Sequence, residues 1–243
     1  MNDMSASRAD TEASTRGDAK ILVWDAPVRV FHWLMVVSFA GAWLTAESER
    51  WRLVHAMLGY TMVGLVALRI VWGLAGTRYA RFSTFVRSPA SVMRYLTSLV
   101  KGHPEHHVGH NPAGAIAIVA MLLMTLGLGA TGWSAYNGTG AHWVGELHEG
   151  VANAMLALVA LHIAAVVASS LLHRENLIGA MVTGYKSGRA DEGIRKARWG
   201  TAALLIALVV GWWWIEWQAA PQAPLAGSSV HGAKPSQHDG DAD

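Results

Sequence analysis

Five stretches of the chain are apolar and long enough to cross a lipid bilayer as helices. They run over residues 28–46, 51–75, 112–135, 148–172 and 199–217. A hydrocarbon core of about 30 Å needs about 20 helical residues, and each stretch is close to or above that length. The pattern therefore predicts an all-α integral membrane protein with five transmembrane helices.

Two of these helices are predicted to begin at a proline that follows a capping side chain. Asp25 and Pro27 precede the first apolar stretch, and Asn111 and Pro112 precede the third. Proline suits the first turn of a helix, where its missing N–H is not needed. Asp and Asn accept hydrogen bonds from the free amides of that turn.

Lysine and arginine are distributed unevenly over the connecting loops. The loops over residues 76–111 and 173–198 hold most of them, the loop after the third helix has none, and the first loop has only Arg50 and Arg52. The positive-inside rule then predicts a cytoplasmic N-terminus, with both basic loops on the same side. Residues 82–100 are apolar at loosely helical spacing, which fits either an amphipathic helix on the cytoplasmic surface or a plain loop helix.

Composition supports a membrane protein and excludes several functions. The chain is 52% hydrophobic and 15% charged, against about 25% charged in average soluble domains. A net charge of +2 does not indicate a protein that binds nucleic acid. The absence of cysteine excludes disulfides, iron–sulfur clusters held by cysteine, cysteine-attached haem and a cysteine nucleophile.

The chain divides into four predicted parts. Residues 1–20 form a disordered cytoplasmic tail without the apolar core of a signal peptide, and residues 21–187 form the main membrane domain. Residues 188–218 contain a linker and the fifth helix, and residues 219–243 form a disordered periplasmic tail.

Tryptophan is abundant, with 12 residues, and most of them lie near predicted helix ends, where an aromatic belt explains them. The dense run from Trp212 to Trp217 fits either interface anchoring or a patch that faces a partner. The belt residues are Trp24, Trp33, Trp43, Trp51, Trp72, Trp133, Trp143 and Trp199.

Four histidines lie in or at the edge of apolar stretches: His32, His55, His148 and His162. A histidine inside a bilayer is costly and indicates a functional site. His148 and His162 are 14 residues apart on one predicted helix, which is about 21 Å along the axis and nearly the same face. One helix thus offers two ligands, one near each membrane surface.

Depth in the membrane pairs His55 with His148 and His32 with His162. Two neutral imidazoles can hold haem iron from opposite faces without any cysteine. The sequence therefore predicts two b-type haems, with these four histidines as the axial ligands of the iron. Small residues next to the ligands, Gly59 and Ala152, leave room for a flat macrocycle and also suit close helix packing.

Other polar residues admit two interpretations each. His110 either caps the third helix or lines a quinone pocket with Asn111, and the cap is the simpler of the two. Arg69 either extends to the cytoplasmic headgroups or pairs with a haem propionate. His173 competes with His162 as a ligand, although a histidine at a helix C-terminus is explained by the helix dipole. The loop histidines His103, His106 and His107 fit a solvated loop.

Several motifs resemble the prokaryotic cytochrome b561 and nickel–iron hydrogenase cytochrome b subunit family. They are VWDAPVRVFHW from Val23, HAMLGY from His55, RIVWGLAGTRYARF from Arg69, GHNPAGA from Gly109, and ELHEG and LHIAAV around His148 and His162. The resemblance covers about residues 21–187. It implies a four-helix haem-binding bundle, with the fifth helix outside it, and the same four histidines as ligands of two b haems.

The resemblance implies electron transfer between membrane quinone and a redox partner, a hydrogenase or a c-type cytochrome, in the respiratory chain of a bacterial inner membrane. An electron-transfer subunit of an oxidoreductase is favoured over a stand-alone enzyme that oxidises superoxide or quinol. A haem-free transporter is disfavoured because Glu149 and Glu216 lie near helix ends rather than at mid-membrane. A membrane anchor for a peripheral enzyme is compatible with the cytochrome.

Overall fold

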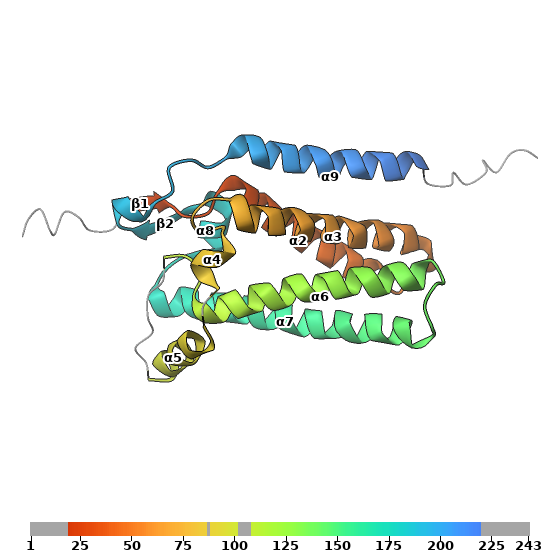
Figure 1. Cartoon of the computed structure of the whole chain (residues 1–243), viewed down its shortest axis with the longest axis horizontal. Helices are drawn as coiled ribbons and strands as arrows, with labels where there is room; N and C mark the ends of the chain where they lie inside the picture. Colours follow the sequence, from red (N-terminus) through yellow and green to blue (C-terminus); the bar gives the residue numbers. More distant parts are fainter. Residues whose placement is uncertain (1–18, 87, 102–107, 220–243) are drawn as a thin grey trace, which may run out of the picture.

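Five long helices lie side by side in the computed structural model, which describes residues 19–86, 88–101 and 108–219 (Figure 1). They are α2 (Ala26–Thr45), α3 (Arg52–Ala75), α6 (Pro112–Tyr136), α7 (Trp143–His173) and α9 (Trp199–Ala219). Each is long and apolar enough to span a membrane. The five predicted helices are thus confirmed, although α7 begins five residues before His148, the predicted start.

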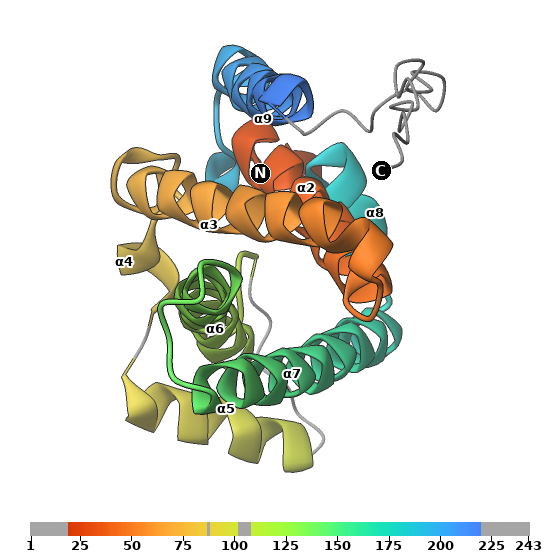
Figure 2. The ribbon, with the colours of Figure 1, turned by 90° about the vertical axis from the view of Figure 1, so that its right-hand side faces the viewer.

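Four of these helices form the bundle, and the fifth lies outside it. In the bundle α2 packs on α3, α3 on α6, and α6 on α7. Helix α9 lies against α2 and α3, as the view along the helices shows (Figure 2). Leu65 of α3 and Leu205 and Val209 of α9 form the buried cluster that joins α9 to the bundle.

Both predicted helix caps are present. The Val28 amide donates to Asp25 Oδ1 at 2.9 Å, and the Gly114 amide donates to Asn111 Oδ1 at 2.7 Å. Pro27 and Pro112 lie in the first turns of α2 and α6. These side chains satisfy amides that have no partner within the helix.

The two ends of the bundle differ in structure. At one end, here called the hairpin end, a turn with a short 3-10 helix (Glu49–Trp51) joins α2 to α3, and residues 137–142 join α6 to α7. The other end, here called the loop-rich end, carries the remaining elements (Figure 1). They are β1 (Ala19–Leu22), α4 (Phe82–Phe85), α5 (Pro89–Val100), α8 (Leu177–Thr183), β2 (Tyr185–Gly188) and the 3-10 helix η2 (Ala190–Glu192).

The segment over 82–100 is not one amphipathic helix. It is divided into α4 and α5 because Val86 is extended and Pro89 begins a new helix. The residue before a proline avoids the helical conformation, which favours a break at this point. Val92 and Tyr95 are buried side chains of α5, and α5 packs on α6.

A small antiparallel sheet corrects the predicted tail and linker. Strand β1 pairs with β2, with Ala19 opposite Gly188. The predicted disordered tail to residue 20 is therefore two residues too long, and residues 1–18 lie outside the described part. The linker before α9 is also attached, because the Ile194 amide donates to Leu22 O and the Ala26 amide to Ala197 O, each at 2.8 Å. The predicted tail after Ala219 lies outside the described residues.

Close backbone contacts hold this sheet against the start of α2. The amides of Val23 and Trp24 both donate to Gly184 O, at 2.9 and 3.1 Å. Gly184 ends α8 with a φ of 91°, and a Cβ there would lie 2.7 Å from Trp24 O. Only glycine meets both conditions without strain.

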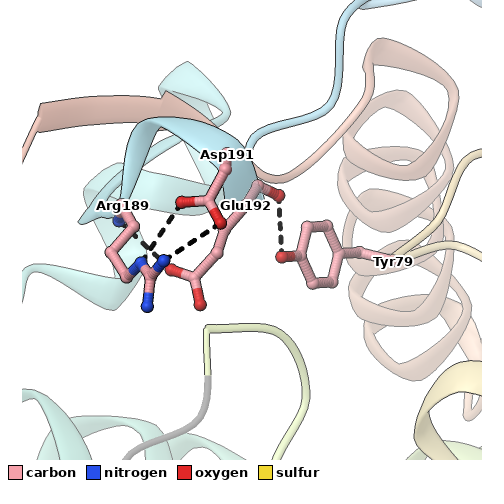
Figure 3. Close-up of polar contacts among 4 residues, drawn as sticks. All are labelled: Tyr79, Arg189, Asp191 and Glu192. Atoms are coloured by element: carbon pink, nitrogen blue, oxygen red, sulfur yellow. Dashed lines mark hydrogen bonds and ion pairs between the residues drawn. The ribbon is translucent and has the colours of Figure 1, made fainter.

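Polar side chains complete the contacts of the loop-rich end. Figure 3 shows the Tyr79 hydroxyl donating to Glu192 O at 2.9 Å, which ties the loop after α3 to η2. Burial raises the pKa of the Tyr79 phenol, so that it stays protonated and can donate. In the same view Arg189 forms an ion pair with Asp191 at 3.2 Å.

Candidate functional site

His55 and His148 face each other at the hairpin end of the bundle. Their ring centroids are 6.2 Å apart and the ring planes are inclined by 72°. His55 lies in the first turn of α3 and His148 in the second turn of α7, so two helices that are distant in sequence supply one imidazole each. The predicted pairing of these two histidines by depth agrees with this geometry.

Hydrogen bonds fix which nitrogen each ring offers. His55 Nδ1 lies 2.8 Å from Ala42 O, a carbonyl acceptor, so Nδ1 carries the proton. His148 Nδ1 lies 3.0 Å from Thr131 Oγ1. Thr131 uses its own proton on Gly127 O, so its oxygen accepts from His148. Both rings therefore present an unprotonated Nε2, the form of histidine that binds a metal.

The neighbourhood of His148 leaves little spare space on one side. A Cβ added at Gly132 would lie 3.0 Å from His148 Cε1, so even alanine would crowd the ring. At Gly59, one turn after His55, an added Cβ would meet nothing within 4 Å. Of these two glycines, Gly132 is therefore the one that lets α6 approach the imidazole.

His32 and His162 are the second predicted pair. Both side chains are half-buried, and they are close enough for a Coulomb interaction between the rings. His32 Nδ1 is buried and has no hydrogen-bond partner within the described structure. An imidazole with a buried, unpartnered nitrogen is a costly feature for packing alone, and it is suited to a ligand.

Helix α7 carries one histidine of each pair on its less exposed face. The inward positions follow helical spacing from His148 through Met155 to His162, whereas Leu161 and Ile163 are 65% and 58% exposed. The 14 residues between the histidines correspond to about 21 Å along the helix. The prediction that they share a face agrees with this pattern.

The donor set fits haem iron better than a bare metal ion. Over the described residues there is no group of three or more His, Asp or Glu side chains that could hold an ion. A haem needs only two protein ligands, because the macrocycle supplies the other four. Histidine nitrogens lie about 2 Å from a bound metal, so two rings on one iron are about 6 Å apart, which agrees with the 6.2 Å between His55 and His148.

Arg69 does not extend to the headgroups, which corrects one of its two predicted roles. Its side chain is 4% exposed and lies over the ring of Phe82, with 5.0 Å from the guanidinium carbon to the ring centroid. One of its terminal nitrogens, Nη1, is buried and has no hydrogen-bond partner among the described atoms.

His110 does not cap α6, since Asn111 forms the cap. The His110 ring lies between those of Trp24 and Phe85, with centroid distances of 4.5 and 4.6 Å. Burial and, to a smaller extent, the nearby Arg69 together lower the pKa of His110 to about 3, so the imidazole is neutral. Its Nδ1 is buried and lacks a hydrogen-bond partner in the described structure.

The buried carboxylate of Asp25 accepts hydrogen bonds from several residues, although the sequence indicated only its role as a helix cap. Its Oδ2 accepts from Trp72 Nε1 at 2.9 Å and from Thr77 Oγ1 at 2.6 Å. Trp24, predicted to be in an aromatic belt, is 7% exposed and packs in the core of the loop-rich end. Trp72 likewise has its N–H inside the protein, because its acceptor Asp25 is buried.

Two further buried cations were missed. Arg29 donates to Val182 O at 2.7 Å and lies 4.9 Å over the Trp199 ring, so it ties α2 to α8 and α9. Lys186 pairs with Glu175 at 3.0 Å. The VWDAPVRVFHW motif contains Arg29, but nothing in the sequence indicates its partners.

The other histidines lie apart from the proposed pairs or outside the described residues. His142 is exposed, and its Nδ1 lies 3.5 Å from a carboxylate oxygen of Glu146. His173, the rival ligand, is the last residue of α7. His103, His106 and His107 lie outside the described residues.

Comparison with known proteins gives a consistent result. The family model described as prokaryotic cytochrome b561 matches residues 23–184, which include both histidine pairs. No solved structure matches the chain significantly.

Among curated proteins, the chain is similar to subunits named as probable Ni/Fe-hydrogenase B-type cytochromes. The protein of Rhodobacter capsulatus is 24% identical over 76% of this chain and 88% of its own length. The Ni/Fe-hydrogenase 1 subunit of Escherichia coli K12 is 24% identical over 72% of this chain and 94% of its own. The protein of Azotobacter vinelandii is 25% identical over 75% and 95%.

Proposed function

This chain belongs to the prokaryotic cytochrome b561 family, and we propose that it carries electrons through two b-type haems between membrane quinone and a partner hydrogenase. It is a multi-pass bacterial membrane protein and a b-type cytochrome of electron transfer. The number of haems, their ligands, the quinone and the partner are the parts that we propose.

The proposal rests mainly on the His55 and His148 pair. Two rings 6.2 Å apart, each with Nδ1 held by a hydrogen bond, present two Nε2 atoms for one iron. We assign His55 and His148 to one haem at the hairpin end, and His32 and His162 to a second haem nearer the loop-rich end. The unpartnered Nδ1 of His32 supports the second assignment.

Double histidine ligation suits electron transfer rather than oxygen chemistry. A b-type haem, when bound, supplies an iron that gains or loses one electron, and with two axial histidines it has no open position. The protein contributes the orientation of each imidazole through Ala42 and Thr131 and the apolar helices that exclude water. Helix α7 joins the two sites with one histidine at each.

We propose that the loop-rich end is cytoplasmic in the inner membrane, with the N-terminus on that side. Most described loop cations lie at this end, whereas the hairpin end has only Arg50 and Arg52. Positive charge is retained on the cytoplasmic side. The cations of the loop-rich end include Arg78, Arg81, Arg94, Lys101, Arg174, Lys186, Arg189, Arg195, Lys196 and Arg198.

Quinone exchange is proposed near the His32 and His162 pair. Trp33, the residue after His32, donates to Met181 O of α8 at 3.4 Å, so α8 contacts α2 next to His32 in the chain. The α8 side chains Ile178 and Val182 are 52% and 55% exposed and give an apolar approach for an isoprenoid tail. The Asn111 oxygen caps α6, which leaves its amide NH2 group for a quinone.

The partner is proposed from the names of the relatives, which are hydrogenase cytochrome subunits aligned along most of their length. A hydrogenase would supply electrons, and the chain would deliver them to quinone.

Transmembrane electron transfer tests the proposed function. Haem-loaded chain is reconstituted in liposomes that contain ferricyanide, and quinol is added outside, so that electrons run through the same reversible path in the direction opposite to the proposed one. We expect ferricyanide reduction with the unsubstituted chain and with His142→Leu, which alters an exposed histidine at the hairpin end. His55→Leu should abolish it. Equal rates for His55→Leu and the unsubstituted chain would refute the pathway.

A further inference from the structure

Arg69 is a buried cation whose hydrogen bonding is incomplete. The side chain is 4% exposed, and its Nη1 has no hydrogen-bond acceptor in the described structure. A guanidinium carries five donor N–H groups in a planar fork that matches a carboxylate. A buried charged donor without an acceptor is strongly unfavourable. The position therefore requires an acceptor beyond those that the neighbouring side chains supply.

Asp25, a carboxylate within electrostatic range of Arg69, already accepts other hydrogen bonds. Its charge interacts favourably with Arg69 at a distance. Its Oδ1 accepts from the Val28 amide, and its Oδ2 accepts from Trp72 and Thr77. Asp25 thus compensates part of the charge of Arg69 without accepting a hydrogen bond from Arg69 Nη1.

His110 contributes a second unpartnered nitrogen to the same region. Its Nδ1 is buried, and its ring is within Coulombic range of both Arg69 and His162. Tilted ring contacts with Trp24 and Phe85 restrict the orientation of the imidazole. A neutral imidazole held in this way can donate one hydrogen bond through Nδ1. His110 therefore lies within electrostatic range of both Arg69 and the proposed iron ligand His162, and Arg69 and His110 each carry a buried nitrogen without a partner in the described structure.

We propose that Arg69 and His110 bind a carboxylate, namely a propionate of the haem held by His32 and His162. The inference rests on the proposed function, because it presumes a haem at that pair. A propionate has the charge and the oxygen pair that an unpartnered guanidinium nitrogen requires. Arg69 is then a positioning residue, and its charge favours the reduced form of the iron, which carries one positive charge fewer.

Redox titration of variants tests this assignment. The potential that disappears in His32→Leu identifies the haem of the His32 and His162 pair. In Arg69→Gln we expect the ratio of reduced to oxidised iron at that haem to fall about tenfold at fixed ambient potential, which is about 59 mV for one electron. Arg69→Lys, which keeps the charge, should stay closer to the unsubstituted chain. Arg81→Gln alters an exposed arginine at the same end and should change nothing.

His110→Phe provides an independent variant. It keeps a ring between Trp24 and Phe85 but removes the donor, so the potential of the same haem should fall by less than in Arg69→Gln. The haem at His55 and His148 serves as an internal control and should keep its potential in every variant. Pyridine haemochrome stoichiometry is measured alongside each titration. Loss of one haem in Arg69→Gln with retention in Arg69→Lys also supports the assignment.

Three results would overturn the inference. The first is unchanged potentials in Arg69→Gln and His110→Phe with both haems bound. The second is an altered KM for quinol with unchanged potentials, which would assign the residues to the quinone. The third is loss of a haem in both Arg69 variants with an unchanged potential in His110→Phe. If His32→Leu keeps two haems, the proposed pairing of His32 with His162 fails together with the inference. If His32→Leu loses one haem, any of the three results above overturns the inference alone and leaves the proposed function intact.

Discussion

The side chains that hold the proposed ligands matter as much as the ligands. The acceptor of His55 is a backbone carbonyl of α2, whereas the acceptor of His148 is the Thr131 hydroxyl of α6. Partners of this kind fix the tautomer and raise the basicity of a metal-bound imidazole. Thr131 is therefore a site where the ligand can be weakened without replacing it.

Substitution of Thr131 by valine should weaken haem binding at the hairpin end. The change keeps the shape of the side chain but removes the acceptor for His148 Nδ1. We expect a loss of affinity of roughly 10- to 100-fold, as for other such partners. Haem transfer from the purified chain to an apoprotein acceptor measures it, with Thr131→Ser as the control that keeps the hydroxyl. Equal transfer rates for all three proteins would contradict the role of Thr131.

His110 should make the protein less stable in acid. Its pKa is about 3 in the folded chain against 6.5 ordinarily. Between these values the unfolded chain binds a proton that the folded chain does not, so stability falls as pH falls below 6.5. From pH 7.5 to 5.5 the unsubstituted chain should lose about 1.4 kcal/mol more than His110→Phe. Thermal inactivation of the two proteins at both pH values measures the difference, and parallel shifts would show that His110 does not contribute.

Individual residues show where sequence reasoning succeeds and where it stops. The caps Asp25 and Asn111 were predictable because a cap acts within three residues of chain. The other partners of Asp25, Trp72 and Thr77, lie 47 and 52 residues away. The sequence indicates that a buried carboxylate needs partners, but only the fold determines which residues supply them.

Among the elements, α9 is the addition to the family bundle. The family match ends at residue 184, before α9 begins at Trp199. Trp213 Nε1 donates to Thr61 Oγ1 of α3 at 2.9 Å, so a polar contact within the apolar region supplements the packing of Leu205 and Val209. Hydrogen bonds between membrane helices contribute about 0.6 kcal/mol on average.

Loss of the Trp213 hydrogen bond should slightly weaken the attachment of α9 to α3. Trp213→Phe should lower the stability of the detergent-solubilised chain by about 0.6 kcal/mol for the bond, with a further loss for the smaller ring. Trp214→Phe is the matched control, because Trp214 is 65% exposed. Thermal inactivation and protease sensitivity of the 188–198 segment are the readouts. A larger effect of Trp214→Phe would contradict this attachment of α9.

Helices were predictable as elements because their signal is local and continuous. Each apolar stretch marks its own span, and all five agree with the structure within a few residues. The pairing of β1 with β2 joins Ala19 to Gly188, and no short-range pattern indicates it. The same limit explains why residues 188–198 were interpreted as a linker, although Ile194 and Ala197 bond to the chain before α2.

Considered as a whole, the molecule places one proposed histidine pair toward each end of a four-helix bundle. Helix α7 contributes to both proposed pairs, and the loop-rich end adds the buried Asp25 and Arg69 and the half-buried His110, which lies within electrostatic range of His162. This arrangement is asymmetric: hydrogen bonds satisfy the Nδ1 atoms at the hairpin end, whereas His32 Nδ1 has no partner in the described structure. The two proposed haems should therefore have different potentials.

The most direct test of this account is the number of b haems per polypeptide. The purified chain and the four single His→Leu variants are measured by pyridine haemochrome and by reduced-minus-oxidised spectra. We expect two haems in the unsubstituted chain and one in each variant, with His55→Leu and His148→Leu losing the same spectral component. A single haem in the unsubstituted chain, or different components lost in those two variants, would contradict the pairing.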